Sequence, residues 1–164
     1  MYVGLIAHRG NMWGPNPERE NDPNYVNEVL NAPGDFDAEV DLWADRGGLW
    51  LGHDGPTYRI PDGWLKNRHA RLWVHCKNVQ ALEYCKIHRD LNYFWHQNDD
   101  YTVTSLGYIW VYPGKPVPHC GVKVDKDCSK NCSSTNKFEI LCSDWVGEVA
   151  RDHKNASRGE VHNG

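Results

Sequence analysis

The chain has 164 residues, a length typical of one domain. It carries 18 Lys and Arg against 22 Asp and Glu, and this charge of −4 argues against a nucleic-acid-binding surface, which is usually basic. Eight Trp and eight Tyr argue against disorder, and no apolar run approaches the ~18 residues of a transmembrane helix.

The first apolar stretch, residues 3–8, is short, has no basic flank before it and runs directly into His8-Arg9-Gly10. This pattern predicts a buried strand and disfavours a secretory signal. Without an export signal we expect a cytoplasmic protein, in which most of the six cysteines are reduced thiols.

Hydrophobic periodicity predicts helices at residues 24–30 and 79–88 and a hairpin arm at 49–53. Besides residues 3–8, it predicts strands at residues 36–43, 71–76, 92–96, 102–104, 108–112, 121–124 and 138–142. The chain therefore begins as alternating strands and helices, and its later strand-to-strand gaps are too short for helices. A full barrel of this kind usually needs at least ~200 residues. We expect an α/β fold, a reduced TIM-like (β/α)₈ barrel with several helices missing, formed by residues 1–150 and followed by a polar C-terminal tail, residues 151–164.

Glu39 and Asp41 stand two residues apart in a predicted strand, so their carboxylates leave the same face. Neighbouring carboxylates repel each other, and a divalent cation such as Mg²⁺ or Ca²⁺ removes that cost. His75 and Lys77 repeat the spacing at the end of a later strand, where His can bind a metal and Lys a phosphate. Taken singly, each pair is better explained as part of a solvated strand face.

His8 and His53 each end a short apolar strand and precede residues that turn the chain. Two imidazoles that titrate near neutral pH can act as general acid and general base. Arg9 offers a planar pair of donors for a phosphate oxygen. The alternative for either histidine is a structural role.

These motifs occur in one order along the first half of the chain. They are the sequences HRG at 8–10, EN at 20–21, ExD at 39–41, HD at 53–54 and HxK at 75–77. This order and spacing resemble the glycerophosphodiester phosphodiesterase family of the PLC-like phosphodiesterase superfamily, which includes bacterial phospholipases and spider-venom sphingomyelinase D. The resemblance is weak in the second half.

The resemblance implies a barrel with a divalent cation at its C-terminal mouth. It implies that His8 and His53 are the acid–base pair, that Arg9 binds the phosphate and that Glu39 and Asp41 bind the metal. Glu20 matches a displaced carboxylate of the family pattern, which implies a further metal ligand.

The chain departs from the family pattern at His75, where the family usually has a metal-binding carboxylate. A histidine is still a competent ligand, but it removes one negative charge and favours a softer metal. We therefore expect Mg²⁺, with Mn²⁺ and Ca²⁺ as alternatives.

The second half adds candidate substrate contacts. His96 follows a predicted strand, and Trp110 lies between Tyr108 and Tyr112 on one aromatic face. Contact with an alcohol or lipid group is one interpretation of these residues, and core packing is the alternative for the aromatic ones. The cysteines at 120, 128 and 132 lack the usual spacing of zinc ligands, which favours a loop of free thiols.

Together, the sequence predicts a metal-dependent phosphoric diester hydrolase that acts on a small phosphodiester or a lysophospholipid-type substrate. Lys77, His96 and Trp110 join Arg9 as expected substrate contacts, and His75 joins the expected metal ligands. The alternatives are a non-catalytic barrel that binds a phosphorylated ligand and a Cys/His zinc-binding protein. The sequence does not decide which histidine is the acid and which is the base.

Overall fold

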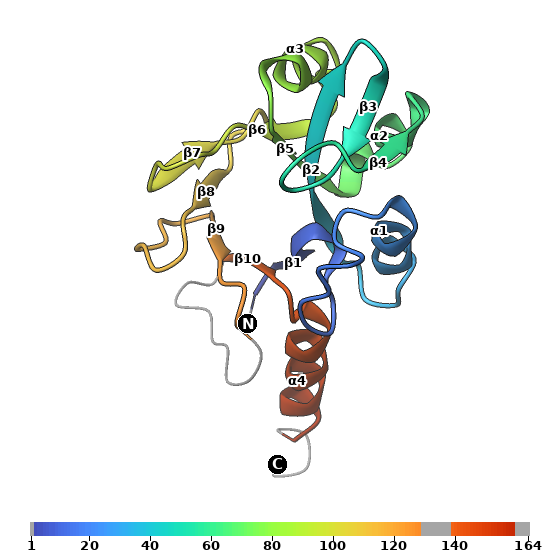
Figure 1. Cartoon of the computed structure of the whole chain (residues 1–164). Coiled ribbons are helices and arrows are strands. Elements are labelled where there is room, and N and C mark those ends of the chain that lie inside the picture. Colours follow the sequence, from blue (N-terminus) through green and yellow to red (C-terminus); the bar gives the residue numbers. More distant parts are fainter. Residues whose placement is uncertain (1, 129–138, 160–164) are drawn as a thin grey trace.

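The computed structural model describes residues 2–128 and 139–159, and its central element is a ten-stranded mixed sheet that curls around a buried interior (Figure 1). Seven strands run parallel, in the spatial order β6 (Asn92–Phe94), β5 (Leu72–Cys76), β2 (Asp37–Asp45), β1 (Gly4–Ala7), β10 (Ile140–Ser143), β9 (Gly121–Val124) and β8 (Ile109–Val111). Three are antiparallel to their neighbours: β3 (Gly48–Leu51), β4 (Tyr58–Ile60) and β7 (Tyr101–Val103).

The expected reduced (β/α)₈ barrel is wrong, because strands and helices do not alternate around the sheet. The helices of the described residues are α1 (Pro23–Leu30), the single turn α2 (Gly63–Lys66), α3 (Val79–Ile87) and α4 (Val146–Gly159), with short 3₁₀ turns at His8–Gly10 and His69–Arg71.

Two local features explain the difference. Only residues 104–108 link β7 to β8, which is too short for a parallel crossover, so the two strands pair antiparallel. Residues 112–120, between β8 and β9, contain three prolines and therefore form no helix.

The predicted strands and the two predicted helices form close to their expected positions. The α1 helix begins at Pro23, and the side chain of Asp22 accepts a hydrogen bond from the Asn24 backbone N–H at 2.8 Å. The sequence analysis did not predict β4, α2 or α4. The α4 helix crosses residue 150, where we expected a polar tail to begin, because Val146 and Val149 pack against the core.

The two faces of the curled sheet bury separate groups of apolar side chains. The outer face of β2 and β5 packs against α2, α3 and the β3–β4 hairpin. The interior is filled by the residues Ile6, Trp73, Phe94, Trp110, Val122, Val124 and Cys142. Because side chains alternate along a strand, the next inward positions toward the strand C-termini lie above this layer.

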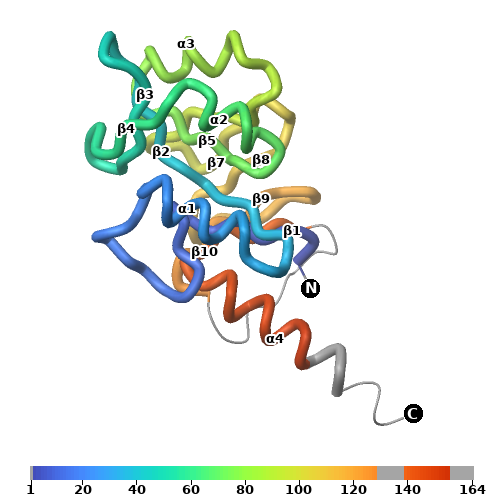
Figure 2. The backbone as a smooth tube through the Cα atoms, turned by 90° about the vertical axis from the view of Figure 1, so that its right-hand side faces the viewer, coloured from blue at the N-terminus to red at the C-terminus, as the bar shows by residue number. Residues whose placement is uncertain are grey.

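The sheet is weakly joined where β6 approaches the β7–β8 hairpin. Ser105 accounts for the backbone contact there: its N–H donates to the Tyr93 carbonyl at 2.8 Å, and its hydroxyl accepts from the Tyr93 N–H at 3.0 Å. On the other side of the molecule, α4 extends away from the body, far from α3 (Figure 2). None of the helices in the described segments is long and apolar enough to cross a membrane.

The expectation that the cysteines at 120, 128 and 132 are all free thiols is wrong. Cys128 is disulfide-bonded, whereas a loop of free thiols was expected, and Cys132 lies outside the described residues. Cys120 is free and exposed, as expected for a thiol. Within residues 2–128 and 139–159, the group of side chains able to hold a metal contains no cysteine.

Candidate functional site

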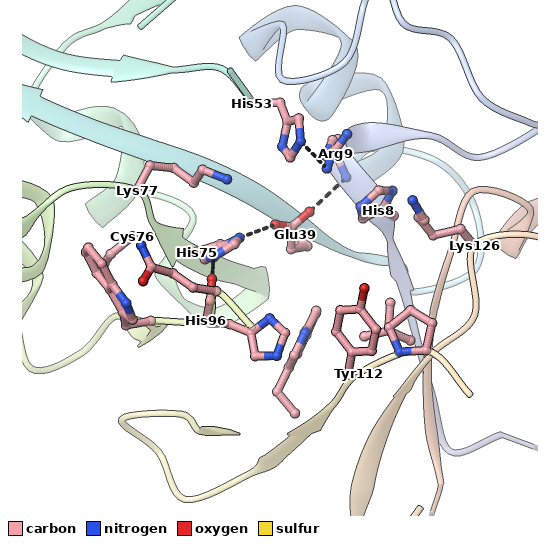
Figure 3. Close-up of a pocket in the computed structure, with 15 residues that line it drawn as sticks. His8, Arg9, Glu39, His53, His75, Cys76, Lys77, His96, Tyr112 and Lys126 are labelled. Carbon is pink, nitrogen blue, oxygen red and sulfur yellow. Dashed lines mark hydrogen bonds and ion pairs between the residues drawn. The ribbon is translucent and has the colours of Figure 1, made fainter. Parts of the chain in front are cut away.

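A cavity of about 470 Å³ opens at the C-terminal ends of the parallel strands (Figure 3). The strands end at one edge of the sheet, so the inward side chains after each strand end meet there. The cavity is lined by His8, Arg9, Glu39, His53, His75, Cys76, Lys77, Trp95, His96, Gln97, Trp110, Tyr112, Pro113, Val124 and Lys126.

Glu39, Asp41 and His75 form a group with the composition of a metal site. One potential ligand atom of each lies within 4.8 Å of the others. The parallel register of β2 and β5 pairs Asp41 with His75 and Glu39 with Trp73, so the three polar side chains share the inner face. Both carboxylates are buried, with 2% and 1% of their residue surface exposed.

The orientation of the His75 imidazole is fixed by contacts on the side of the ring that faces away from the carboxylates. Its Nε2 donates to the His96 carbonyl at 2.8 Å, and its ring stacks on Phe94 at a centroid distance of 5.0 Å. This leaves Nδ1 facing the carboxylates, 3.1 Å from Asp41 Oδ1 and 3.8 Å from Glu39 Oε1. Metal-binding histidines commonly have their second nitrogen held by a carbonyl in this way.

The two oxygens of Asp41 differ in their surroundings. Oδ2 accepts a hydrogen bond from Asn21 Nδ2 at 3.0 Å, and His53 Nδ1 lies 3.3 Å from it. Oδ1 is buried and accepts no well-formed hydrogen bond from the described residues, although His75 Nδ1 and Lys77 Nζ lie within 3.4 Å. A buried carboxylate oxygen of this kind is costly unless a cation or donor satisfies it.

The ionisation of the group reflects its burial. Burial, and then the charge of Asp41, raises the pKa of Glu39. For Asp41 burial acts in the same direction, but the close contacts with the imidazoles of His53 and His75 and the charge of Arg9 outweigh it and hold the pKa well below its usual range. The pKa of His75 is raised, because its carboxylate partners outweigh its burial. The site is thus built to attract positive charge.

His8 is held by an aspartate from the last strand. Its Nδ1 lies 2.8 Å from Asp144 Oδ1, which also accepts from Asn11 Nδ2 at 2.9 Å. An Nδ1–H donated to a carboxylate fixes the tautomer, so Nε2 is the nitrogen available to a ligand. Burial alone would raise the pKa of Asp144, but the contact with His8 lowers it.

His53 lies between Arg9 and Asp41, with 42% of its side chain exposed. Its Nε2 is 3.2 Å from Arg9 Nη2 and its Nδ1 is 3.3 Å from Asp41 Oδ2. Since arginine can only donate, Nε2 accepts this hydrogen bond and Nδ1–H points to Asp41.

Arg9 links both histidine motifs to the carboxylates. Its backbone has a positive φ of 52°, and its N–H donates to Glu39 Oε2 at 3.1 Å. Its guanidinium donates to Glu20 Oε2 at 2.9 Å. Glu20, expected as a metal ligand, instead pairs with Arg9 and Asn11, and it is not part of the group formed by Glu39, Asp41 and His75.

The expected substrate contacts all line the cavity but differ in character. Lys77 Nζ lies 3.4 Å from Asp41 Oδ1. His96 is held through Nε2 by the Asp99 carbonyl at 2.6 Å. Trp110 is only 5% exposed and stacks on Phe94 at 4.4 Å, so most of this indole belongs to the core.

Two polar residues of the site, Asn11 and Lys126, had no predicted role, and Asp144 was expected at the mouth after the last strand but without its partner. Asp144 follows the last strand, but nothing in its local sequence identifies its partner, His8, which is distant along the chain. Lys126 stands two residues after the inward Val124, the same offset that separates Lys77 from His75. That alternation was the available signal.

Comparisons with protein-family models, curated proteins and solved structures gave no match for this chain. The candidate site is therefore interpreted from its own geometry.

Proposed function

We propose that this protein is a metal-dependent phosphodiesterase of the kind implied by the resemblance to the glycerophosphodiester phosphodiesterase family. The observation that carries the proposal is the group formed by Glu39, Asp41 and His75. Glu39 and His75 line the pocket together with His8 and His53, and Asp41 is buried beside them. The expected substrate is a small phosphodiester or a lysophospholipid-type molecule.

The residues present fit a divalent cation. Asp41 Oδ1 is a buried oxygen without a well-formed hydrogen bond from the described residues, and His75 Nδ1 faces it with its second nitrogen already held. Two carboxylates and one imidazole suit Mg²⁺ or Mn²⁺ better than Ca²⁺. When bound, such an ion would offset charge on a phosphate oxygen and orient the attacking oxygen.

The two histidines supply the proton transfers in this proposal. Asp144 holds His8 so that Nε2 faces the pocket, and Asp41 holds His53 through Nδ1. One imidazole takes the proton from the attacking hydroxyl and the other gives a proton to the leaving alcohol. The guanidinium of Arg9 and the ammonium of Lys77 supply positive charge beside the phosphate.

The direct test is hydrolysis of bis(p-nitrophenyl) phosphate and of glycerophosphodiesters with Mg²⁺, Mn²⁺ or Ca²⁺, and with EDTA. We expect activity that EDTA removes and that Mg²⁺ or Mn²⁺ restores. Asp41→Asn should abolish the metal response, while Glu83→Gln, which changes an exposed carboxylate on α3, should retain it. Metal-independent turnover, or an unaffected Asp41→Asn variant, would contradict the proposal.

One observation favours a second candidate, a non-catalytic protein that binds a phosphorylated ligand in the same pocket. The Nε2 of His53 is occupied by Arg9, which would keep it from acting on a proton. This alternative predicts saturable binding of inorganic phosphate by calorimetry together with no turnover of any diester.

A further inference from the structure

Lys126 brings a cation into the pocket from the side opposite the metal group (Figure 3). It continues the inward alternation of β9 after Val122 and Val124. Between β9 and β5, which carries His75, lie the strands β10, β1 and β2. The Lys126 carbonyl accepts hydrogen bonds from the Asp144 N–H and the Ser143 hydroxyl, both at 3.3 Å, so its backbone is fixed at the rim.

The other cations of the pocket have carboxylate partners, and Lys126 does not. Arg9 pairs with Glu20 at 2.9 Å, and Lys77 lies 3.4 Å from Asp41. Among residues 2–128 and 139–159, no carboxylate lies within 4.0 Å of the Lys126 ammonium. Its charge nevertheless reaches the site, because it helps to lower the pKa of Asp144.

A charge balance indicates what this ammonium would meet. Arg9 lies between Glu20 and Asp41, at 2.9 and 3.2 Å, and a divalent cation would offset the remaining negative charge of Glu39 and Asp41. A phosphodiester carries a single negative charge, which Lys77 can match. Asp144 is buried and its Oδ1 is engaged by His8 and Asn11, so within the described residues it forms no ion pair with the Lys126 ammonium, which remains open to an anion of the ligand.

The aromatic side chains that line the pocket would favour a cationic ligand group instead of an anionic one, since a quaternary ammonium group binds aromatic faces. Here the indole of Trp110 is buried, and Tyr112, which is 46% exposed, is the more open of the two rings. Trp110 stacks on Phe94 at 4.4 Å, and the rings of Tyr112 and His96 are 5.7 Å apart. The uncompensated charge of Lys126 is therefore the stronger determinant.

Resting on the proposed function, we infer that Lys126 is a specificity determinant that favours phosphodiesters whose second ester group carries an additional anion, a carboxylate or a phosphate. Diesters that carry a quaternary ammonium group are disfavoured at the same position.

The test uses p-nitrophenyl phosphodiesters that differ only in the second ester group. The groups are 2-carboxyethyl, 2-phosphoethyl, the neutral 3,3-dimethylbutyl and the cationic 2-(trimethylammonio)ethyl. We expect kcat/KM to be highest for the anionic esters and lowest for the cationic one. A single ion pair at an exposed lysine corresponds to a change in kcat/KM of about threefold between the anionic and neutral esters, and again between the neutral and cationic esters, mainly through KM. The two anionic arms show whether a carboxylate or a phosphate is preferred.

Lys126→Gln should reduce this preference to near unity, and Lys126→Glu should reverse it in favour of the cationic ester. Lys123→Gln is the matched control: it removes a nearby lysine, on β9, that pairs with Asp125 and does not line the pocket. Circular dichroism checks that each variant is folded. Equal kcat/KM across the series, a preference for the cationic ester, or a preference that survives in Lys126→Gln would overturn this inference while leaving the phosphodiesterase proposal intact. No turnover of any ester, with any metal, would overturn both.

Discussion

Replacing Glu39 with glutamine tests the candidate metal site without a substrate. Glu39 is 2% exposed, and burial together with the charge of Asp41 raises its pKa. The ionised carboxylate therefore costs folding free energy when no cation is bound. Glutamine has nearly the same shape and keeps an oxygen that can accept the Arg9 N–H, which lies 3.1 Å from Glu39 Oε2.

We expect Glu39→Gln to stabilise the metal-free protein by about 1–2 kcal/mol, the low end of the range for neutral replacement of buried charge. For a chain of this length, each kcal/mol corresponds to about 2–4 °C in Tm. The sign follows from the raised pKa. The cost of the charge is full above the folded-state pKa of Glu39 and disappears as the pH falls toward the unfolded-state value. The difference should thus be largest near pH 8 and vanish near pH 4.

A saturating divalent cation should make the wild-type chain more stable than Glu39→Gln. At a free ion concentration of about 100 times Kd, the wild-type chain gains about 2.7 kcal/mol. The variant lacks one ligand and should gain much less. Thermal unfolding in EDTA and in MnCl₂ measures both effects, with Glu83→Gln on the surface of α3 as the control, expected within about 0.5 kcal/mol of wild type in both. A wild-type Tm unaffected by every divalent cation, or a Glu39→Gln variant that is less stable in EDTA, would refute this reasoning.

Three further predictions concern the pocket. His8→Ala and His53→Ala should each lower turnover by about 10²–10⁴-fold, while calorimetry should show that metal binding is retained. A nitrophenolate leaving group should partly rescue the variant that lacks the general acid. Near-native rates of both variants on alkyl diesters would exclude the two-histidine mechanism. Asp144→Asn should lower turnover by at least about 10²-fold without unfolding the chain, because the amide no longer fixes the His8 tautomer, and unchanged kinetics would show that this contact is only structural. Trp110→Ala should cost about 3–5 kcal/mol in urea unfolding, since this indole is 5% exposed and packs on Phe94, whereas a loss confined to KM would make it a substrate contact.

The polar residues at strand ends were the most predictable part of the site. Alternation along β2 places Glu39 and Asp41 on one face, and the same rule applies to His75 on β5. These rules are local, and they depend only on the strands being parallel. They hold even though the expected (β/α)₈ barrel does not form.

The features that could not be predicted depend on contacts between distant parts of the chain. The pairing of His8 with Asp144 joins the first strand to the last, and no spacing rule connects them. Glu20 was assigned from a sequence pattern, but its position beside Arg9 follows from the path of a loop. The antiparallel direction of β7 follows from the short turn before β8, whereas the short gaps between the later strands were expected to be loop crossovers between parallel strands.

The same geometry suggests why metal binding and folding would be coupled in this chain. β2 is paired with β1 on one side and β5 on the other, so its inward carboxylates lie in the middle of the parallel strands. The sheet has few covering helices and a weak junction at Ser105, so its stability depends strongly on these central strands. The buried charge of Glu39, whose pKa is raised, weakens the metal-free fold, and a cation held between β2 and β5 would turn Glu39 and Asp41 into a cross-link. In the proposed function Glu39 and Asp41 lie close together for chemistry, and the same placement would make the folded state responsive to the ion.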